Sequence, residues 1–303
     1  MERQALMGQL SGISHRHCFI PCSRTTGGIV QRPTAYCALT KHRFDNLVLQ
    51  MKHSSSFRSI YVSVSAIGNT CASANFDSVV PSKEVIELWR SANAVCFDVD
   101  STVCLDEGID ELAEFCSAGK AVAEWTARAM GGSVPFEEAL AARLNIMKPS
   151  LKQVEDFLRQ RPPKISPGIM ELVNKLKSRN VDVYLVSGGF RQMINPVAAI
   201  LGIPEVNIYA NRLLFDSGGE FDGFDEKELT SRSGGKATAV ERIRKDGNYK
   251  SLIMIGDGAT DLEARQPGGA DMFICYAGVQ LREPVASKAD WVVFSFSDLI
   301  NSF

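Results

Sequence analysis

Residues 94–102 read AVCFDVDST, four apolar residues followed at once by two acids with one residue between them. A short apolar run of this kind is typical of a strand that is buried on both faces of a sheet. A turn that begins where the strand ends can place Asp98 and Asp100 around a single point. The pair suits one nucleophile and one acid–base group, although an ordinary strand-to-helix turn would explain it equally well.

Five more apolar runs of similar length follow, and the segments between several of them have the apolar spacing of amphipathic helices. The predicted strands cover residues 94–98, 181–186, 206–210, 251–255, 272–276 and 291–294. Strands that alternate with helices predict an α/β fold with a Rossmann-like parallel sheet core. The paired glycines 218 and 219 predict a hairpin within residues 211–224.

The segment from residue 105 to residue 161 has no strand pattern. Its apolar residues repeat at helical spacing in two stripes, one through Leu112 and one through Leu140. Because ligands bind at the carboxyl ends of parallel strands, we expect this insertion after the first strand to form a helical cap over the site. The predicted domains are a leader at 1–76, a core at 77–104 and 164–303, and a cap at 105–163.

Three other predicted strand or helix ends carry polar groups. Ser187 and the glycines at 188–189 follow one strand, and their hydroxyl and amides can bind the oxygens of an anion. Asp257 and Asp261 follow another strand and can offer oxygen ligands to a hard cation. Lys236 follows two glycines ahead of a predicted helix and supplies a compact positive charge. Taken singly, each could be a glycine turn, a helix cap or a surface lysine.

The charge of the chain is unevenly distributed. The formal net charge of −2 combines a basic segment at 1–76, with a balance of +6, and an acidic remainder of −8. An acidic body argues against a nucleic-acid partner, and no run approaches the roughly 18 apolar residues of a membrane span. We therefore expect a small-molecule substrate and neither nucleic acid nor membrane; the sequence does not specify an oligomeric state.

The leader differs from the body in composition. Residues 1–76 are rich in arginine and serine and contain only two acids, which is typical of an organelle transit peptide. The serine content favours the chloroplast over the mitochondrion, and a plain disordered tail is the alternative. All four histidines lie in this segment, so the body must work without histidine chemistry.

The ordered motifs D-V-D-S-T, V-S-G-G-F, G-G-K and G-D-G-A-T-D resemble those of the haloacid dehalogenase superfamily. The insertion and the context L-A-A-R-L-N-I-M-K around Arg143 resemble the members that act on phosphoserine. The resemblance covers about residues 82–303 and implies a haloacid dehalogenase-like fold. It also implies hydrolysis of O-phospho-L-serine to L-serine and phosphate, the last step of the phosphorylated pathway of serine biosynthesis.

The resemblance implies a role for each core motif. Asp98 would be the nucleophile that forms an aspartyl-phosphate, and Asp100 the acid–base group. Mg²⁺ would be held by Asp98, the backbone carbonyl of Asp100 and Asp257, with Asp261 in support. The phosphoryl oxygens would be bound by Ser187, Gly188, Gly189 and Lys236.

The resemblance also assigns the residues that select the substrate. Glu107 would bind the ammonium group and Arg143 the carboxylate, in agreement with the preference of arginine for planar carboxylates. The remaining implied pocket residues are Met130, Gly131, Phe136 and Thr260. At Thr260 some members carry asparagine, so a local contact differs there.

Two alternatives stay open. A phosphotransferase, or a phosphatase for another small phosphate, would share the four core motifs but would not need both Glu107 and Arg143. A catalytically inactive binding protein with the same fold would not need Asp98, Asp100, Lys236 and Asp257 together.

The leader composition gives a first testable prediction. Deletion of residues 1–76 should leave folding and phosphatase activity unchanged, because the predicted strands, helices and motifs all lie downstream. Circular dichroism and turnover of the truncated protein check this. A folded but inactive truncation would contradict it.

Overall fold

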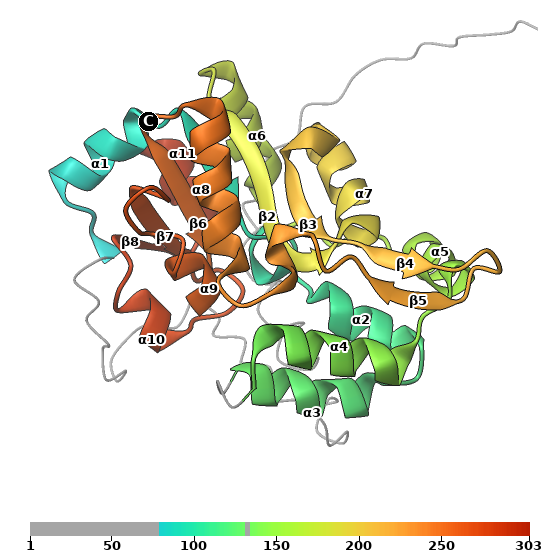
Figure 1. Cartoon of the computed structure of the whole chain (residues 1–303). Coiled ribbons are helices and arrows are strands. Elements are labelled where there is room, and N and C mark those ends of the chain that lie inside the picture. The colour runs from blue at the N-terminus through green and yellow to red at the C-terminus, as the bar shows by residue number, and fades with distance from the viewer. Residues whose placement is uncertain (1–78, 131–133) are drawn as a thin grey trace, which may run out of the picture. The chain divides into compact units, whose positions relative to one another are not determined.

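The strand predicted from residues 94–98 lies inside a six-stranded parallel sheet (Figure 1). This computed structural model describes residues 79–130 and 134–303. Strand β1 (Ala94–Phe97) is buried at every position and pairs with β2 (Asp182–Phe190) on one side and β6 (Leu252–Gly256) on the other. The order is β3-β2-β1-β6-β7-β8, and the other strands are β3 (Ile208–Asn211), β7 (Met272–Tyr276) and β8 (Trp291–Val293).

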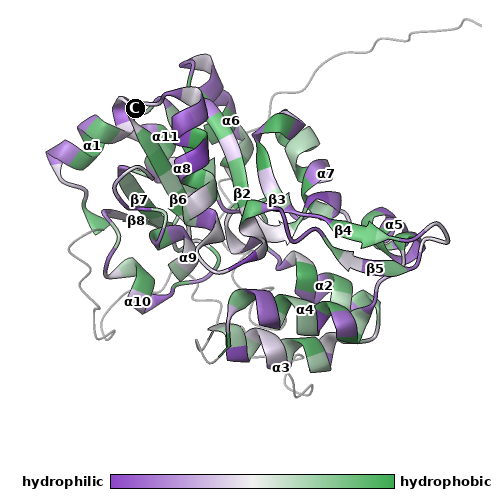
Figure 2. Ribbon diagram, in the orientation of Figure 1, coloured by the Kyte–Doolittle hydropathy of each residue, from purple (hydrophilic) through white to green (hydrophobic). Residues whose placement is uncertain are grey.

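Helices cover both faces of the sheet because alternate side chains of each buried strand point to opposite faces. Val95 and Phe97 face a core cluster shared with one group of helices, whereas Ala94 and Cys96 face a second cluster. The first group contains α1 (Lys83–Arg90), α6 (Ile169–Ser178), α7 (Arg191–Leu201) and α11 (Phe296–Asn301). The second face is covered by α8 (Gly235–Gly247), α9 (Ala259–Leu262) and α10 (Glu283–Ala286). Figure 2 shows the hydrophobic strands between helices that carry hydrophilic residues.

All six predicted strands are present, and in two of them one limit differs from the prediction by two residues or more. Strand β2 continues through the glycine pair to Phe190, which pairs with Asn211 of β3, so V-S-G-G-F lies inside the strand and not after it. Strand β3 begins at Ile208, because the residues after Pro204 form a short 3-10 turn in which Val206 is 79% exposed. The segment before β2, where apolar residues recur at helical spacing, forms α6.

Between Cys104 and α6 the described residues form four α-helices and no strand, and we call this segment the helical insertion. The helices are α2 (Gly108–Phe115), α3 (Gly119–Met130), α4 (Phe136–Met147) and α5 (Leu151–Gln160). Leu112 and Leu140, the markers of the two predicted stripes, are buried in one apolar cluster. The predicted hairpin is confirmed as β4 (Leu213–Phe215) and β5 (Phe221–Phe224), and its Leu213 packs in the same cluster.

The two linkers of the helical insertion run side by side. Cys104 pairs with Ile165 in an antiparallel bridge, the Leu105 N–H donates to the Lys164 carbonyl, and the Ser166 N–H donates to the Val103 carbonyl, both at 2.9 Å. The insertion therefore leaves and rejoins the core at one point. No helix within residues 79–130 and 134–303 has the length and apolar content to cross a membrane.

The strand order reverses direction between β1 and β6. On one side the chain adds β2 and β3, and on the other side it adds β6, β7 and β8. In open parallel sheets such a switch point leaves a crevice at the carboxyl ends of the strands, where ligands bind. The acids predicted after β1 and β6 therefore flank the crevice.

Candidate active site

Asp98 comes directly after β1 at the switch point. Its N–H donates to the Ile255 carbonyl of β6 at 2.9 Å, which continues the strand pairing by one residue and fixes the backbone. Its side chain is buried, and Oδ1 lies 2.7 Å from the Lys236 Nζ. The carboxylate is therefore held rigidly and paired with a cation.

Lys236 lies in the first turn of α8 and joins two acids. Its Nζ is 2.7 Å from Asp98 Oδ1 and 2.7 Å from Asp261 Oδ1. Burial alone would lower the pKa of this lysine, but the two carboxylates outweigh burial and raise it. The ammonium thus stays charged and neutralises part of a strongly acidic site.

Asp257 completes a group of three acids. One carboxylate oxygen from each of Asp98, Asp257 and Asp261 lies within 4.8 Å of the others. The loop after β6 brings them together: the Gly258 N–H donates to Asp261 Oδ2 at 2.9 Å, and a Cβ on Gly256 would lie 2.3 Å from Asp261 Cγ. Buried carboxylate oxygens that converge in this way match the oxygen ligands that hard divalent cations prefer.

The electrostatics of these acids agree with a cation site. Burial, and then the charge of Asp98, raise the pKa of Asp257 and of Asp261 above the usual aspartate value. A bound divalent cation would offset this repulsion, because opposite charge favours the ionised carboxylates.

Asp100 lies on the helical turn Val99–Val103 that follows Asp98. Its Oδ1 accepts the Gly108 N–H at 2.7 Å, and its Oδ2 faces Gly189, where a Cβ would be only 3.2 Å away. Burial, with smaller contributions from Glu107 and Asp98, raises the pKa of Asp100 to about 8. A carboxyl group with this pKa can carry a proton at neutral pH and release it later.

The end of β2 presents a hydroxyl and two glycines to the same site. Ser187 is fully buried, and its Oγ accepts the Gly189 N–H at 2.9 Å. Asn211 Nδ2 donates to the Gly188 carbonyl at 2.8 Å, which holds this irregular strand end in place. Since the Ser187 oxygen already accepts a hydrogen bond, its own proton can be donated to an anion.

Phe136, the first residue of α4, lies against the same strand end. A Cβ added to Gly188 would meet the Phe136 ring at 3.0 Å, so a side chain at position 188 would displace the ring. The helical insertion thus contributes an aromatic wall beside the anion-binding glycines.

Glu107 precedes α2 and faces two partners. Its Oε1 accepts the Ser101 hydroxyl at 2.7 Å and lies 3.9 Å from Arg282 Nη2. Burial raises the pKa of Glu107, although its side chain keeps 35% exposure. The carboxylate is therefore oriented but still accessible to a ligand.

Arg143 lies on α4 and is 7% exposed. Its Nε donates to the Ala139 carbonyl at 3.2 Å, and its Nη1 lies 3.5 Å from Thr126 Oγ1. Burial lowers the pKa of this guanidinium, while the charges of Asp110, Glu107 and Asp100 oppose the shift. The negative charge of Glu107 therefore helps to keep the buried guanidinium of Arg143 charged.

Three predicted pocket residues receive less support. Met130 ends α3 and its side chain is not described, and Gly131 lies outside the described residues. Thr260 is exposed in the short helix α9.

Two residues of the site were not predicted from the sequence. Arg282 precedes α10 and donates through Nε to Asp257 Oδ2 at 2.8 Å. Ser101 adopts a left-handed backbone conformation, with φ of 54°, and holds Glu107. Ser101 belongs to the D-V-D-S-T motif, but no local pattern distinguishes Arg282, which reaches the site only through the fold.

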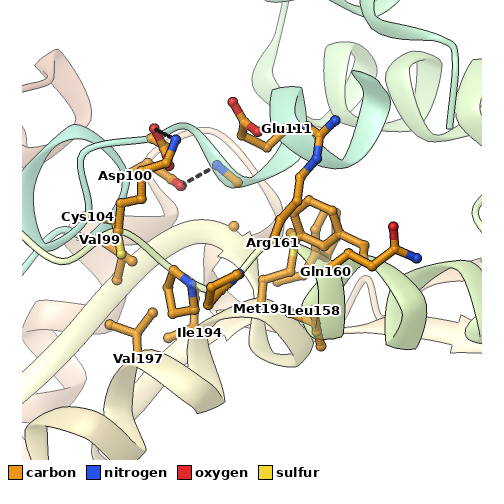
Figure 3. A pocket seen from close by; sticks show the side chains of 18 residues that line it. Val99, Asp100, Cys104, Glu111, Leu158, Gln160, Arg161, Met193, Ile194 and Val197 are labelled. Atoms are coloured by element: carbon orange, nitrogen blue, oxygen red, sulfur yellow. Dashed lines mark hydrogen bonds and ion pairs between the residues drawn. The ribbon is translucent and has the colours of Figure 1, made fainter. Parts of the chain in front are cut away.

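A cavity of about 510 Å³ approaches Asp100 from the side of α5 and α7 (Figure 3). Most of its lining is apolar, including Phe157, Phe190 and Met193, and the linkers of the helical insertion border it. Lys236 and Asp257 do not line it, whereas Asp100 and Gly189 do, so the cavity reaches one side of the predicted site.

Comparison with known proteins agrees with this geometry. Residues 92–269 match the family model described as haloacid dehalogenase-like hydrolase. The chain belongs to the haloacid dehalogenase-like hydrolases. The chain is 75% identical over 225 residues to "Phosphoserine phosphatase, chloroplastic" of Arabidopsis thaliana, covering 74% of this chain and 76% of the relative.

Two further comparisons extend the similarity. Phosphoserine phosphatase of Mus musculus is 50% identical over 222 residues, with 73% of this chain and 98% of the relative covered. A solved structure, "Phospho-Aspartyl Intermediate Analogue of Phosphoserine phosphatase", matches with a TM-score of 0.60 and 26% identity, covering 69% of this chain and 98% of that one.

The Lys236 bridge gives a prediction about stability. Lys236→Met removes the cation shared by two buried carboxylates, which should lower the unfolding free energy by about 3–5 kcal/mol when both are ionised. The loss should be larger at pH about 8.5 than at pH about 5, because protonation at the lower pH relieves the repulsion between the two carboxylates.

Urea unfolding at both pH values measures this difference. Lys245→Met, which removes an exposed lysine from the same helix, is the matched control and should change little at either pH. Equal losses for Lys236→Met at both pH values would show that the lysine acts through packing alone.

Proposed function

We propose that the chain hydrolyses O-phospho-L-serine to L-serine and phosphate, through an aspartyl-phosphate on Asp98. The observation that carries the proposal is the position of Asp98, paired with Lys236 at 2.7 Å inside a group of three buried acids. The names of the relatives support the substrate, and the similarity to a solved phospho-aspartyl analogue of a phosphoserine phosphatase supports the intermediate.

In the first step an Asp98 carboxylate oxygen attacks phosphorus, and the bond between phosphorus and the seryl oxygen breaks. Asp100 gives its proton to the departing seryl oxygen; its pKa of about 8 keeps it protonated at neutral pH. The products of this step are L-serine and phosphorylated Asp98.

In the second step Asp100, now ionised, takes a proton from a water molecule. The water oxygen attacks phosphorus, and the bond to the Asp98 oxygen breaks. Phosphate leaves, Asp98 regains its carboxylate, and Asp100 is again protonated. The same residue thus serves as acid and then as base.

The phosphoryl oxygens would be bound by three kinds of donor. Ser187 can donate its hydroxyl proton, because its oxygen already accepts the Gly189 N–H. The Gly188 amide and Lys236 add a backbone dipole and a full charge. Preorganised donors of this kind stabilise the charge that develops during phosphoryl transfer.

Asp98, the backbone carbonyl of Asp100 and Asp257 would hold Mg²⁺, with Asp261 in support. Bound there, the ion would neutralise charge on the phosphoryl group and on the carboxylates. Arg282 donates to Asp257 at 2.8 Å and orients it.

The helical insertion would select the amino-acid part of the substrate. Glu107 would bind the ammonium group and Arg143 the carboxylate. Phe136, Met130 and Gly131 would close the pocket, and Thr260 would contribute a polar contact at its rim. This division corresponds to a core at 77–104 and 164–303 and a cap at 105–163.

Residues 1–76 would direct the protein to the chloroplast stroma as a transit peptide. The leader composition supports this, and so does the name of the Arabidopsis thaliana relative. There the enzyme would supply L-serine as the last step of the phosphorylated pathway.

The covalent step gives a prediction about Asp98. Asp98→Asn should lower turnover of phosphoserine by about a thousandfold or more, because an amide oxygen is a poor nucleophile. Mass spectrometry of acid-quenched protein should find a phosphoryl group on the Asp98 peptide of the wild type only. Asp222→Asn, at an exposed hairpin position, is the control. Near-normal turnover of undeamidated Asp98→Asn would exclude this mechanism.

Substrate choice gives a prediction about Arg143. Arg143→Ala should lower kcat/KM for phosphoserine by about ten- to a hundredfold, because it removes a charge-assisted contact to the carboxylate. The kcat/KM for phosphoethanolamine, which lacks the carboxylate, and for a simple aryl phosphate should change little. Arg159→Ala, at an exposed arginine of α5, controls for loss of charge. Equal losses on all three substrates would remove the support for a carboxylate site.

Cation binding gives a prediction about pH. Raised pKa values of Asp257 and Asp261 mean that the folded protein holds extra protons, whose stabilising effect is lost as pH rises through those pKa values. Mg²⁺ competes with these protons, so its affinity should rise by up to about tenfold per pH unit for each proton displaced.

Thermal unfolding checks this without a turnover assay. The increase in Tm caused by Mg²⁺ should be larger at pH about 8 than at pH about 6, and chelation should abolish both the increase and the activity. A pH-independent increase, or one that persists in Asp257→Asn, would contradict binding at the three acids.

A further inference from the structure

Three side chains, Asp110, Thr126 and Arg143, form a hydrogen-bonded series that links α2, α3 and α4. Thr126 Oγ1 on α3 donates to Asp110 Oδ1 on α2 at 3.1 Å, and the Arg143 Nη1 on α4 lies 3.5 Å from the same hydroxyl oxygen. The direction is fixed by chemistry: an ionised carboxylate only accepts, so the hydroxyl proton points to Asp110 and its lone pairs face the guanidinium.

This arrangement leaves Arg143 without a direct counterion. Among residues 79–130 and 134–303, no acid lies within ion-pair distance of Arg143, although the side chain is only 7% exposed. Of its five N–H donors, Nε is used by the Ala139 carbonyl and one Nη1 proton faces Thr126. The other three donors have no hydrogen-bond partner among the described residues.

We propose that Thr126 and Asp110 are positioning residues that orient Arg143 for the substrate carboxylate. Asp110 attracts the guanidinium through one intervening hydroxyl, so it stabilises the buried charge without occupying the donors that the substrate needs. A carboxylate paired directly with Arg143 would compete with the substrate. The inference rests on the proposed role of Arg143 and explains how its selectivity is built.

Thr126→Val tests the relay, because valine nearly preserves the shape of threonine and removes the hydroxyl. We expect kcat/KM for phosphoserine to fall about three- to tenfold, mainly through KM, with turnover of phosphoethanolamine changed by less than about twofold. Thr126→Ser keeps the hydroxyl and should stay close to the wild type. The kcat/KM of Asp110→Asn for phosphoserine should lie between the values of Thr126→Val and Thr126→Ser, since the amide oxygen still accepts a hydrogen bond but carries no charge.

A double-mutant cycle separates the relay from helix packing. In the Arg143→Ala background, Thr126→Val should lower kcat/KM for phosphoserine by less than about twofold, because the arginine that Thr126 orients is absent. Equal loss on both substrates, an unchanged loss in the Arg143→Ala background, or no loss at all would overturn the proposal.

The ¹⁵N relaxation of the Arg143 side chain, assigned by its absence in Arg143→Lys, gives a readout independent of turnover. The Arg143 Nη1 group, which faces Thr126, should be rigid in the full-length wild type and in Thr126→Ser, and mobile in Thr126→Val. An equally rigid Nη1 group in Thr126→Val would reject the relay. If the wild type failed to hydrolyse phosphoserine, the proposed function would fail, whereas the relaxation result would still decide whether Thr126 orients Arg143.

Discussion

Lys236 holds together two carboxylates that would otherwise repel each other inside the protein, because its ammonium lies 2.7 Å from both Asp98 and Asp261. Three elements must be placed correctly for this contact: the end of β1, the first turn of α8 and the short helix α9 that follows β6. The parallel sheet supplies that placement, since its strands end at the same edge. The pairing of one lysine with two acids therefore links the sheet topology to the chemistry of the site.

Local patterns were sufficient for much of the fold and for the core motifs. Buried strands such as β1 and β7 are short apolar runs, and α6 has an apolar stripe at helical spacing, so these elements could be predicted from the sequence. The limits of β2 and β3 could not be predicted in this way. Phe190 stays in β2 because it pairs with Asn211, a partner that no local pattern reveals.

The site residues divide in the same way into those that could be predicted and those that could not. Asp98, Asp100 and Asp257 follow strands and form recognisable motifs. Arg282 reaches Asp257 across 25 residues of sequence, in a segment whose composition is ordinary. The support for Arg143 comes from two other helices, so only the packing of the helical insertion reveals it.

The adjacent linkers at Cys104 and Ile165 bear on how this architecture can change during evolution. A segment inserted here must begin and end about one strand spacing apart, roughly 4.8 Å, and must satisfy few other conditions of the sheet. The residues proposed to bind phosphate lie outside the linkers, whereas Glu107, Arg143 and the Gly108 N–H that binds Asp100 lie between them. Under the proposed function, exchange of the whole segment for another helical module would change the compound recognised, and it would keep the phosphate chemistry if the new module also supplied an amide to Asp100.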